Sequence, residues 1–313
     1  MKRDGILQKA LKDLGMELKY YPFLKGDDVN FFLYRGDIDF GIGGDMPALS
    51  AASTTDVIIP VILQQGFSSI LATRPMMAKQ LRGKRIAYPF GSIAHFVVLD
   101  VLASEEIKES AAVLVPMDIP RLAQALNTGE IDAFAAWEPI SAISKKTHKD
   151  FVVIYQQMTT GYMYVLKNFF EKNPEATREI VTSVVRAFRW MKKKRENLLH
   201  AGEWAKQAGE SLGAQKIPLS SKEMADLAQK DILGLTSVPL ISSDDLRHNG
   251  PLHREFRFLK ALGKIPPSAT WKRVRNSFDR KILNEVLVNQ VRFGLHRFDY
   301  HTDSPNKEYG EEK

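Results

Sequence analysis

Three short stretches of the sequence place glycines, carboxylates or hydroxyls directly before a predicted helix. In the first, Gly43, Gly44 and Asp45 follow the alternating residues 38–42, which predict a strand, and precede a helix that begins at Met46. A glycine loop at a helix start lets another molecule approach free backbone N–H groups, which suits an anion or a polar ligand head. We therefore expect the loop to bind a ligand, with Asp45 either capping the helix or binding an amine.

The other two stretches follow the same plan. Gly91 and Ser92 lie between a predicted strand and a predicted helix, and Trp137 and Glu138 do so further along the chain. Ser92 either caps its helix or donates to an anion with the help of the helix dipole. Trp137 either covers an apolar part of a ligand or packs in the core, and Glu138 either binds an ammonium group or caps the next helix. We interpret His95 as structural, because nothing pairs it with a nucleophile or a metal.

The first and third stretches also resemble each other. Residues 36–40 are Gly-Asp-Ile-Asp-Phe, and residues 129–133 are Gly-Glu-Ile-Asp-Ala. Two similar strand-and-helix units in one chain predict two similar lobes. Gln65 and Thr160 lie at the ends of predicted strands and are weaker candidates. The candidate ligand-binding residues are Gly43, Gly44, Asp45, Gln65, Gly91, Ser92, Trp137, Glu138 and Thr160.

The composition excludes several classes of site. The 313 residues are 44% hydrophobic and 26% charged, which is ordinary for a globular protein, and none is cysteine. Disulfides, thiolate catalysis and cysteine-ligated metals are therefore excluded. The net charge of +7 favours anionic partners, but the basic residues are spread out except at 192–195, and no recognised nucleic-acid motif occurs. We expect no nucleic-acid partner, no cofactor, no metal and no catalytic residue.

Strands and helices alternate over the first half of the chain, and helices dominate after Pro174. Strands are predicted at 17–23, 57–63, 68–72, 151–155 and 162–166, with a polar break at 64–66, and one long helix is predicted at 175–199. This order predicts an α/β protein with parallel sheets.

Residues 36–49, 81–95 and 129–139 together resemble the solute-binding proteins of nitrate, sulfonate and taurine ABC importers, the SsuA-like members of the NMT1/THI5-like family. The resemblance covers roughly residues 6–290. It implies the two-lobed α/β fold of the type II periplasmic-binding-protein superfamily, with a hinge and a central ligand cleft.

The resemblance also implies the division of the chain. We expect residues 1–73 and 161–291 to form lobe one, 74–160 to form lobe two, and 292–313 to be a polar tail. The chain begins within the helix that follows the family's first strand, and we therefore expect this strand to be missing.

By this resemblance the protein is a solute-binding component, not an enzyme. It is expected to capture a small anionic or zwitterionic molecule of the sulfonate, taurine or nitrate class and to deliver it to an ABC permease in the membrane. The family implies a monomer in the periplasm or at the cell surface, whereas no signal peptide is visible and the chain as written would stay in the cytoplasm. Two alternatives stay open: a THI5-like pyrimidine-precursor enzyme, whose cysteine-rich iron motif is absent here, and a ligand-sensing domain of the same fold.

Overall fold

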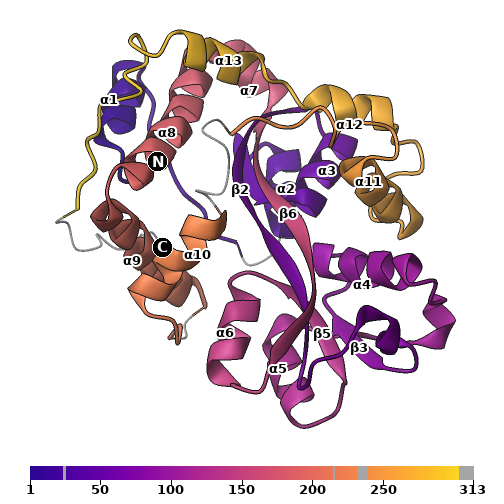
Figure 1. Cartoon of the computed structure of the whole chain (residues 1–313). Helices are drawn as coiled ribbons and strands as arrows, with labels where there is room; N and C mark the ends of the chain where they lie inside the picture. The colour runs from indigo at the N-terminus through magenta and orange to yellow at the C-terminus, as the bar shows by residue number, and fades with distance from the viewer. Residues whose placement is uncertain (24–25, 214–215, 232–238, 303–313) are drawn as a thin grey trace.

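Two long antiparallel strands, β2 (Val57–Ala72) and β6 (Val152–Leu166), run through the molecule and connect its two halves (Figure 1). The computed structural model describes residues 1–23, 26–213, 216–231 and 239–302. The two strands pair along their length with three irregularities of register. Each is continuous where we predicted two separate strands, because the polar residues 64–66 pair with residues 159–161 instead of breaking the sheet.

The other strands flank this pair in one six-stranded sheet of order β1-β6-β2-β5-β3-β4. They are β1 (Phe40–Gly44), β3 (Arg85–Tyr88), β4 (Val113–Pro116) and β5 (Ala133–Trp137). The pairs β1–β6, β6–β2 and β2–β5 are antiparallel, whereas β3 is parallel to both β4 and β5. The prediction of parallel sheets is therefore wrong for much of the sheet. A chain that crosses between the two halves on β2 and returns beside it on β6 must reverse its direction.

Helices cover both faces of the sheet. At the β1 end lie α1 (Gly5–Asp13), α2 (Gly26–Arg35), α3 (Asp45–Thr54), α7 (Lys167–Lys172), α8 (Pro174–Lys193), α11 (Pro251–Ala261), α12 (Trp271–Ser277) and α13 (Lys281–Val288). At the β4 end lie η1 (Ala78–Leu81), α4 (Ile93–Ser104), η2 (Glu109–Ala111), α5 (Ile119–Asn127) and α6 (Ile140–Thr147). The helices α9 (Arg195–Gly213) and α10 (Ser221–Asp231) pack against each other. The helix predicted at 175–199 is two helices, because Lys194 adopts an extended backbone between α8 and α9.

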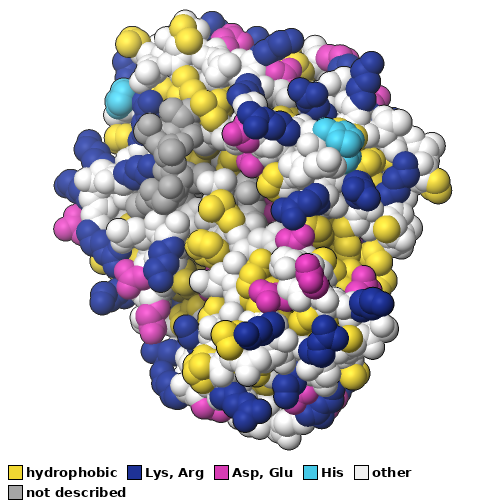
Figure 2. Space-filling model, turned by 45° about the vertical axis from the view of Figure 1, so that its right-hand side comes forward, with side chains coloured by type: hydrophobic (Ala, Val, Ile, Leu, Met, Phe, Trp, Pro, Cys, Tyr) yellow, Lys and Arg dark blue, Asp and Glu magenta, His cyan; other side chains and the backbone are white. Residues whose placement is uncertain are grey.

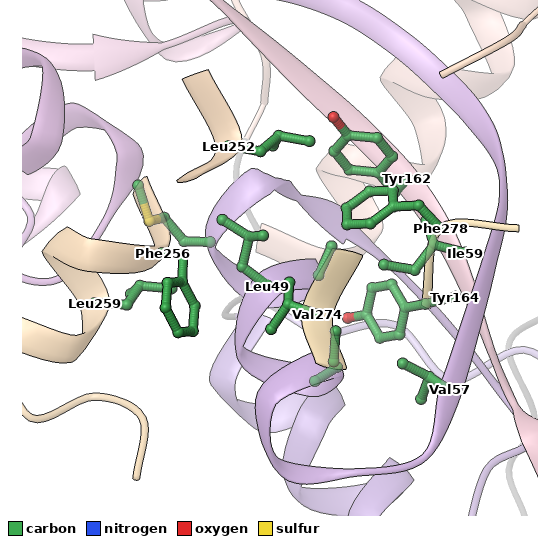
Figure 3. Close-up of a cluster of buried hydrophobic side chains, with 14 of the residues drawn as sticks. Leu49, Val57, Ile59, Tyr162, Tyr164, Leu252, Phe256, Leu259, Val274 and Phe278 are labelled. Atoms are coloured by element: carbon green, nitrogen blue, oxygen red, sulfur yellow. The ribbon is translucent and has the colours of Figure 1, made fainter. Parts of the chain in front are cut away.

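Each half has buried clusters on both faces of the sheet. At the β1 end, one cluster joins the sheet to α2, α3, α11 and α12, and another joins it to α1, α8 and α13. Figure 3 shows the first, with Tyr162 and Tyr164 of β6 near Leu49 of α3 and Phe278. At the β4 end, α4 covers one face and α5 the other. The expected lobe boundaries stay a prediction, and residues 303–313 of the expected tail lie outside the described residues.

Residues 17–23 do not form the strand that we predicted. They line one side of a hollow whose other side includes residues 37–40 and Ile42, and no backbone hydrogen bond joins them to a neighbouring strand among the described residues. The alternating pattern of residues 17–23 was insufficient, because a strand is stable only when its N–H and C=O groups find a partner.

The surface shows no large basic patch on the face in Figure 2, where lysines and arginines are scattered among acidic side chains. Within the described residues, no helix is both long and apolar enough to cross a membrane.

A fully buried ion pair ties the start of the chain to α8. Asp4 and Arg186 have no exposed surface, and Arg186 Nε donates to Asp4 Oδ2 (3.1 Å), which also accepts from Ser183 Oγ (2.7 Å). The other carboxylate oxygen accepts from the N–H groups of Ile6 (3.1 Å) and Leu7 (3.2 Å) and caps α1. Sequence patterns did not single out this pair, because its partners are 182 residues apart.

We expect Asp4→Ala to lower the free energy of unfolding by about 3–5 kcal/mol, because it leaves the Arg186 charge buried without its partner. Urea unfolding followed by circular dichroism measures this. The matched control is Glu130→Ala, whose ion pair with Arg121 is exposed (66% and 53% for Arg121 and Glu130) and contributes at most about 1 kcal/mol. An equal decrease in the free energy of unfolding for the two variants would show that the buried ion pair does not anchor α1.

Candidate ligand-binding site

Four predicted site residues meet where β2 and β6 cross between the two halves. In the sheet, Gly44 lies opposite Gly161, and Gln65 lies opposite Thr160. The Thr160 N–H donates to Asp45 Oδ2 (2.8 Å), which joins β6 to the start of α3. Gly44, Asp45, Gln65 and Thr160 therefore form one group, although they come from four different elements.

The predicted glycine loop is wrong, because Gly43 and Gly44 are the last residues of β1. The Leu166 N–H donates to Asp39 O (2.9 Å), and the alternation of an antiparallel ladder then directs the N–H of Gly43 toward Tyr162. Gly44, not Asp45, is the N-cap of α3, and its N–H and C=O point away from β6. A Cβ on Gly43 would lie 3.0 Å from Cβ of Pro47, so close packing also favours glycine there.

Asp45 belongs to a buried acidic pair. Asp45 and Glu255 of α11 are each 3% exposed, and one oxygen of Glu255 has no hydrogen-bond partner within the described structure. Burial raises the pKa of Asp45 to about 7, although the Thr160 N–H and Tyr162 oppose this shift. Burial, and then the nearby Asp45, raise the pKa of Glu255 well above its ordinary range. A cationic group that reached these carboxyls would be stabilised by them.

The N-terminus of α4 has the opposite electrostatic character. Ser92 is its N-cap, and Ser92 Oγ donates to Pro89 O (2.6 Å) and accepts from the His95 N–H (3.3 Å). Among the described residues no hydrogen bond uses the N–H groups of Ile93 and Ala94. These two N–H groups and the helix dipole favour an anion at this end of α4. Both interpretations of Ser92 therefore remain compatible with the structure, since it caps the helix beside two free donors.

Lys264, which follows α11, lies beside this helix end. A Cβ placed on Gly91, whose φ is +73°, would lie 2.7 Å from Lys264 Cε and 3.4 Å from Nζ. The ammonium group also contacts Asp27 Oδ2 (3.3 Å) and is 36% exposed. Sequence analysis missed Lys264, because a single lysine after a helix carries no signal and its neighbour Gly91 lies far away in sequence.

Side chains of α4 and α11 join the two halves on this side. The Phe258 ring of α11 lies edge-on to His95 (5.1 Å between ring centres) and Phe96 (5.4 Å), and Arg254 Nη1 donates to Asp100 Oδ1 (2.9 Å). Burial lowers the pKa of His95 to about 4, so its ring is neutral at pH 7. His95 is thus a packed structural residue, as predicted.

Trp137 and Glu138 lie at the end of β5. Trp137 is half-buried against the α4-side core and lies opposite Ser68 of β2. Glu138 Oε2 accepts from the Ala142 N–H (3.0 Å), so it caps the first turn of α6, as one of our two interpretations held. Burial and then Glu138 raise the pKa of Asp231 at the end of α10 to about 6. A second acidic pair therefore lies on the α6 side of the long strands.

The predicted site residues thus fall into three groups, around α3, α4 and the end of β5. It stays a prediction that these three groups of residues bind one ligand together. Across the described residues, no group of three or more acidic or histidine side chains is placed to hold a metal ion. The arrangement offers an anion-favouring helix end and a group of buried carboxyls, which are features of a binding site.

Comparisons with known proteins identify the family of this chain. A family model described as NMT1/THI5 like matches residues 15–197. The Taurine-binding periplasmic protein of Escherichia coli (strain K12) is 27% identical in an alignment 280 residues long, which covers 82% of this chain and 82% of that protein.

Solved structures confirm the predicted fold. The periplasmic sulfonate-binding protein SsuA from Methylobacillus flagellatus KT aligns with a TM-score of 0.69 and 17% identity, over 91% of this chain and 86% of that one. The desulfurization enzyme DSZB aligns with a TM-score of 0.58 and 16% identity, over 92% of this chain and 96% of that one. The same fold is therefore found in a binding protein and in an enzyme.

The raised pKa of Asp45 predicts how stability depends on pH. Because the folded state holds this proton from about pH 4 to pH 7 and the unfolded state does not, the free energy of unfolding of the wild type should fall across that interval. Asp45→Asn removes the ionisation and should be more stable than the wild type at pH 8 by roughly 1–3 kcal/mol, with little difference at pH 4. Urea unfolding at the two pH values measures this.

The control for that experiment is Asp56→Asn, which removes an exposed carboxylate (81%) at the other end of α3. Its stability difference from the wild type should change little between pH 4 and pH 8. If the difference in free energy of unfolding between Asp45→Asn and the wild type does not grow with pH, then Asp45 ionises normally in the folded protein.

Proposed function

Since the chain belongs to the NMT1/THI5-like family, we propose that it is the solute-binding component of an ABC importer. It captures a small sulfonate or a similar anionic or zwitterionic molecule and breaks no bond. The name of the taurine-binding relative supports this ligand class. The single structural observation that carries the proposal is the free N-terminus of α4, with Lys264 beside it.

The anionic group of the ligand binds at α4. The N–H groups of Ile93 and Ala94 donate to its oxygens, and the Lys264 ammonium adds a positive charge from the other half of the molecule. A tetrahedral sulfonate has three oxygens and suits several donors that converge from different elements. The start of α3 is less suitable for an anion, because the Asp45 carboxyl already occupies it.

Asp45 and Glu255 give the site its second end. Within the described residues neither carboxyl forms a salt bridge, although the charge of Arg254 acts on Glu255, so their burial is costly unless they stay protonated or a cation neutralises them. An ammonium group on the ligand supplies such a cation. This arrangement favours a zwitterion such as taurine over a plain alkanesulfonate or nitrate.

Ligand binding closes the two halves by bending β2 and β6. The contacts of Phe258 with His95 and Phe96, and of Arg254 with Asp100, belong to the closed form. A ligand that bridges α4 and Lys264 stabilises this form, because it makes both contacts only when the halves are together. The closed protein then docks on the permease, in the periplasm or at the cell surface. Because the enzyme DSZB has a similar fold, each titration is followed by an analysis of whether the recovered ligand is chemically unchanged.

We expect Lys264→Gln to weaken binding of taurine and of ethanesulfonate by about 10-fold to 100-fold, because each loses one charge-assisted contact. Isothermal titration calorimetry measures this, and mass spectrometry of the recovered ligand shows whether it is unchanged. The control Lys272→Gln removes an exposed lysine on α12 and should bind like the wild type. Equal affinities for the two variants would remove Lys264 from the site, and a chemically altered ligand would favour an enzyme.

A matched pair of ligands tests the acidic end of the site. Taurine differs from ethanesulfonate by its amino group, and we expect the wild type to prefer taurine by at least about 10-fold, the value of one charge-assisted hydrogen bond. Asp45→Asn should reduce this preference, whereas Asp56→Asn should keep it. Titration of both ligands against the three proteins gives the ratios. An unchanged preference in Asp45→Asn would place the amine elsewhere.

A further inference from the structure

A pocket of about 700 Å³ lies between the loop that precedes α11 and the segment that joins α12 to α13. The loop contributes Ser243 and Leu246, and the opposite wall comes from residues 275–284. The apolar part of the lining is Leu246 and Phe278, which belong to the buried cluster of Figure 3. None of the candidate ligand-binding residues lines this pocket, so it is a separate feature of the β1 half.

The lining of this pocket is positively charged. Its cations are Arg275 near the end of α12, and Arg280 and Lys281 at the start of α13. In the part of the chain that the structure describes, the side chains of these three residues form no salt bridge, hydrogen bond or ring contact. The one carboxylate in the lining, Asp279, accepts from the backbone N–H of Lys281 (2.8 Å). Three positive charges and one negative charge leave the lining with a net charge of +2.

Arg280 has a buried donor that nothing in the described structure satisfies. Its Nη2 is buried and has no hydrogen-bond partner. The charge of Arg280 acts on Asp245, but the two side chains form no salt bridge, and burial and then Asp244 raise the pKa of Asp245 against this effect. A buried charged donor without an acceptor is costly, and folded proteins nearly always supply one. An anion bound in the pocket would be that acceptor.

The start of α13 adds further donors beside the pocket. Arg280 is the N-cap of this helix, and its side chain makes no capping hydrogen bond. Among the described residues, no hydrogen bond uses the N–H groups of Ile282 and Leu283. The positive end of the helix dipole lies here and favours a negative charge. Lys281 and Asn284 of the same helix line the pocket, so an anion bound there lies near this helix end.

The net charge and the two guanidinium groups select the class of anion. A phosphate monoester carries about −1.5 to −2 charges at pH 7 and three acceptor oxygens, so it balances the charge of the lining. A sulfonate carries a single charge and would leave part of the lining unbalanced. Planar guanidinium groups also match phosphate by donating two parallel hydrogen bonds. The volume of the pocket is in the usual range for sites that hold a small organic molecule.

We propose that this pocket binds a phosphate monoester, carried either by a small soluble compound or by a lipid headgroup. The guanidinium groups of Arg280 and Arg275 donate to the phosphate oxygens, and Lys281 adds the third positive charge. Asn276 and Asn284 supply neutral amides for the organic part. The protein then has a second binding site, which works independently of the sulfonate site.

Two probes distinguish the two sources of phosphate. Glycerol 3-phosphate is titrated by calorimetry, and vesicles of phosphatidylcholine with phosphatidic acid are tested by co-sedimentation against vesicles of phosphatidylcholine alone. Both measurements use the full chain in about 150 mM sodium chloride, which screens weak surface attraction. Saturating taurine is present throughout, so that no phosphate enters the sulfonate site. We expect one of the two probes to bind, and the one that binds identifies the source.

Matched variants test the location. Arg280→Gln should weaken binding of the active probe by at least about 10-fold, because one charge-assisted contact is lost. Arg275→Gln, at an exposed position, should also weaken it and decides the matter if the first variant does not fold. The control Arg74→Gln removes an exposed arginine just after β2 and should bind like the wild type.

Weaker binding in the two pocket variants alone supports the proposal. It is overturned if neither probe binds at millimolar concentration, or if the pocket variants bind the active probe as tightly as Arg74→Gln does. Titration of taurine in the absence of phosphate should give the same affinity for all of these variants. Failure of the phosphate site is therefore distinguishable from failure of the proposed sulfonate site.

Discussion

The antiparallel pairing of β2 with β6 is the constraint on which the rest of the structure depends. These two strands are the shared part of the sheet, and each half of the molecule builds its own cores on their two ends. The pair is continuous through the polar residues 64–66, where Gln65 and Thr160 face each other. The proposed closure bends the pair at this stretch, which lies between the cores of the two halves.

Near the point where β2 and β6 pass between the two halves, the starts of α3 and α4 have opposite electrostatic character. The start of α3 carries Asp45, which is buried with Glu255 and held by the Thr160 N–H. The start of α4 has free N–H groups and the Lys264 side chain. The two ends come from helices that both follow a strand, yet one favours a cation and the other an anion. This difference is the basis of the proposed preference for a ligand with opposite charges at its two ends.

Two neighbouring parts of the chain, residues 17–23 and α1, differ in how they are held in the structure. Residues 17–23 have a strand-like pattern and lie close to β1, but the hollow between them prevents direct pairing. By contrast, the buried Asp4–Arg186 pair holds α1 firmly on α8, since each charge is matched where water is excluded. Residues 1–13 are therefore anchored by a polar contact, while no described strand other than β6 pairs with β1.

The sequence by itself determined the family, the α/β class and the three strand-to-helix stretches, because glycine, capping residues and hydrophobic period act locally. It also identified His95 as structural. Only the tertiary structure decided that the long strands are continuous and antiparallel, that Gly43 is part of β1, and that Glu138 caps α6. Sequence patterns did not identify Glu255 and Lys264. Their neighbours in the fold, Asp45 and Gly91, lie some 170–210 residues away along the chain. Burial and pairing partners are set by the whole chain, and the raised pKa of Asp45 follows from them.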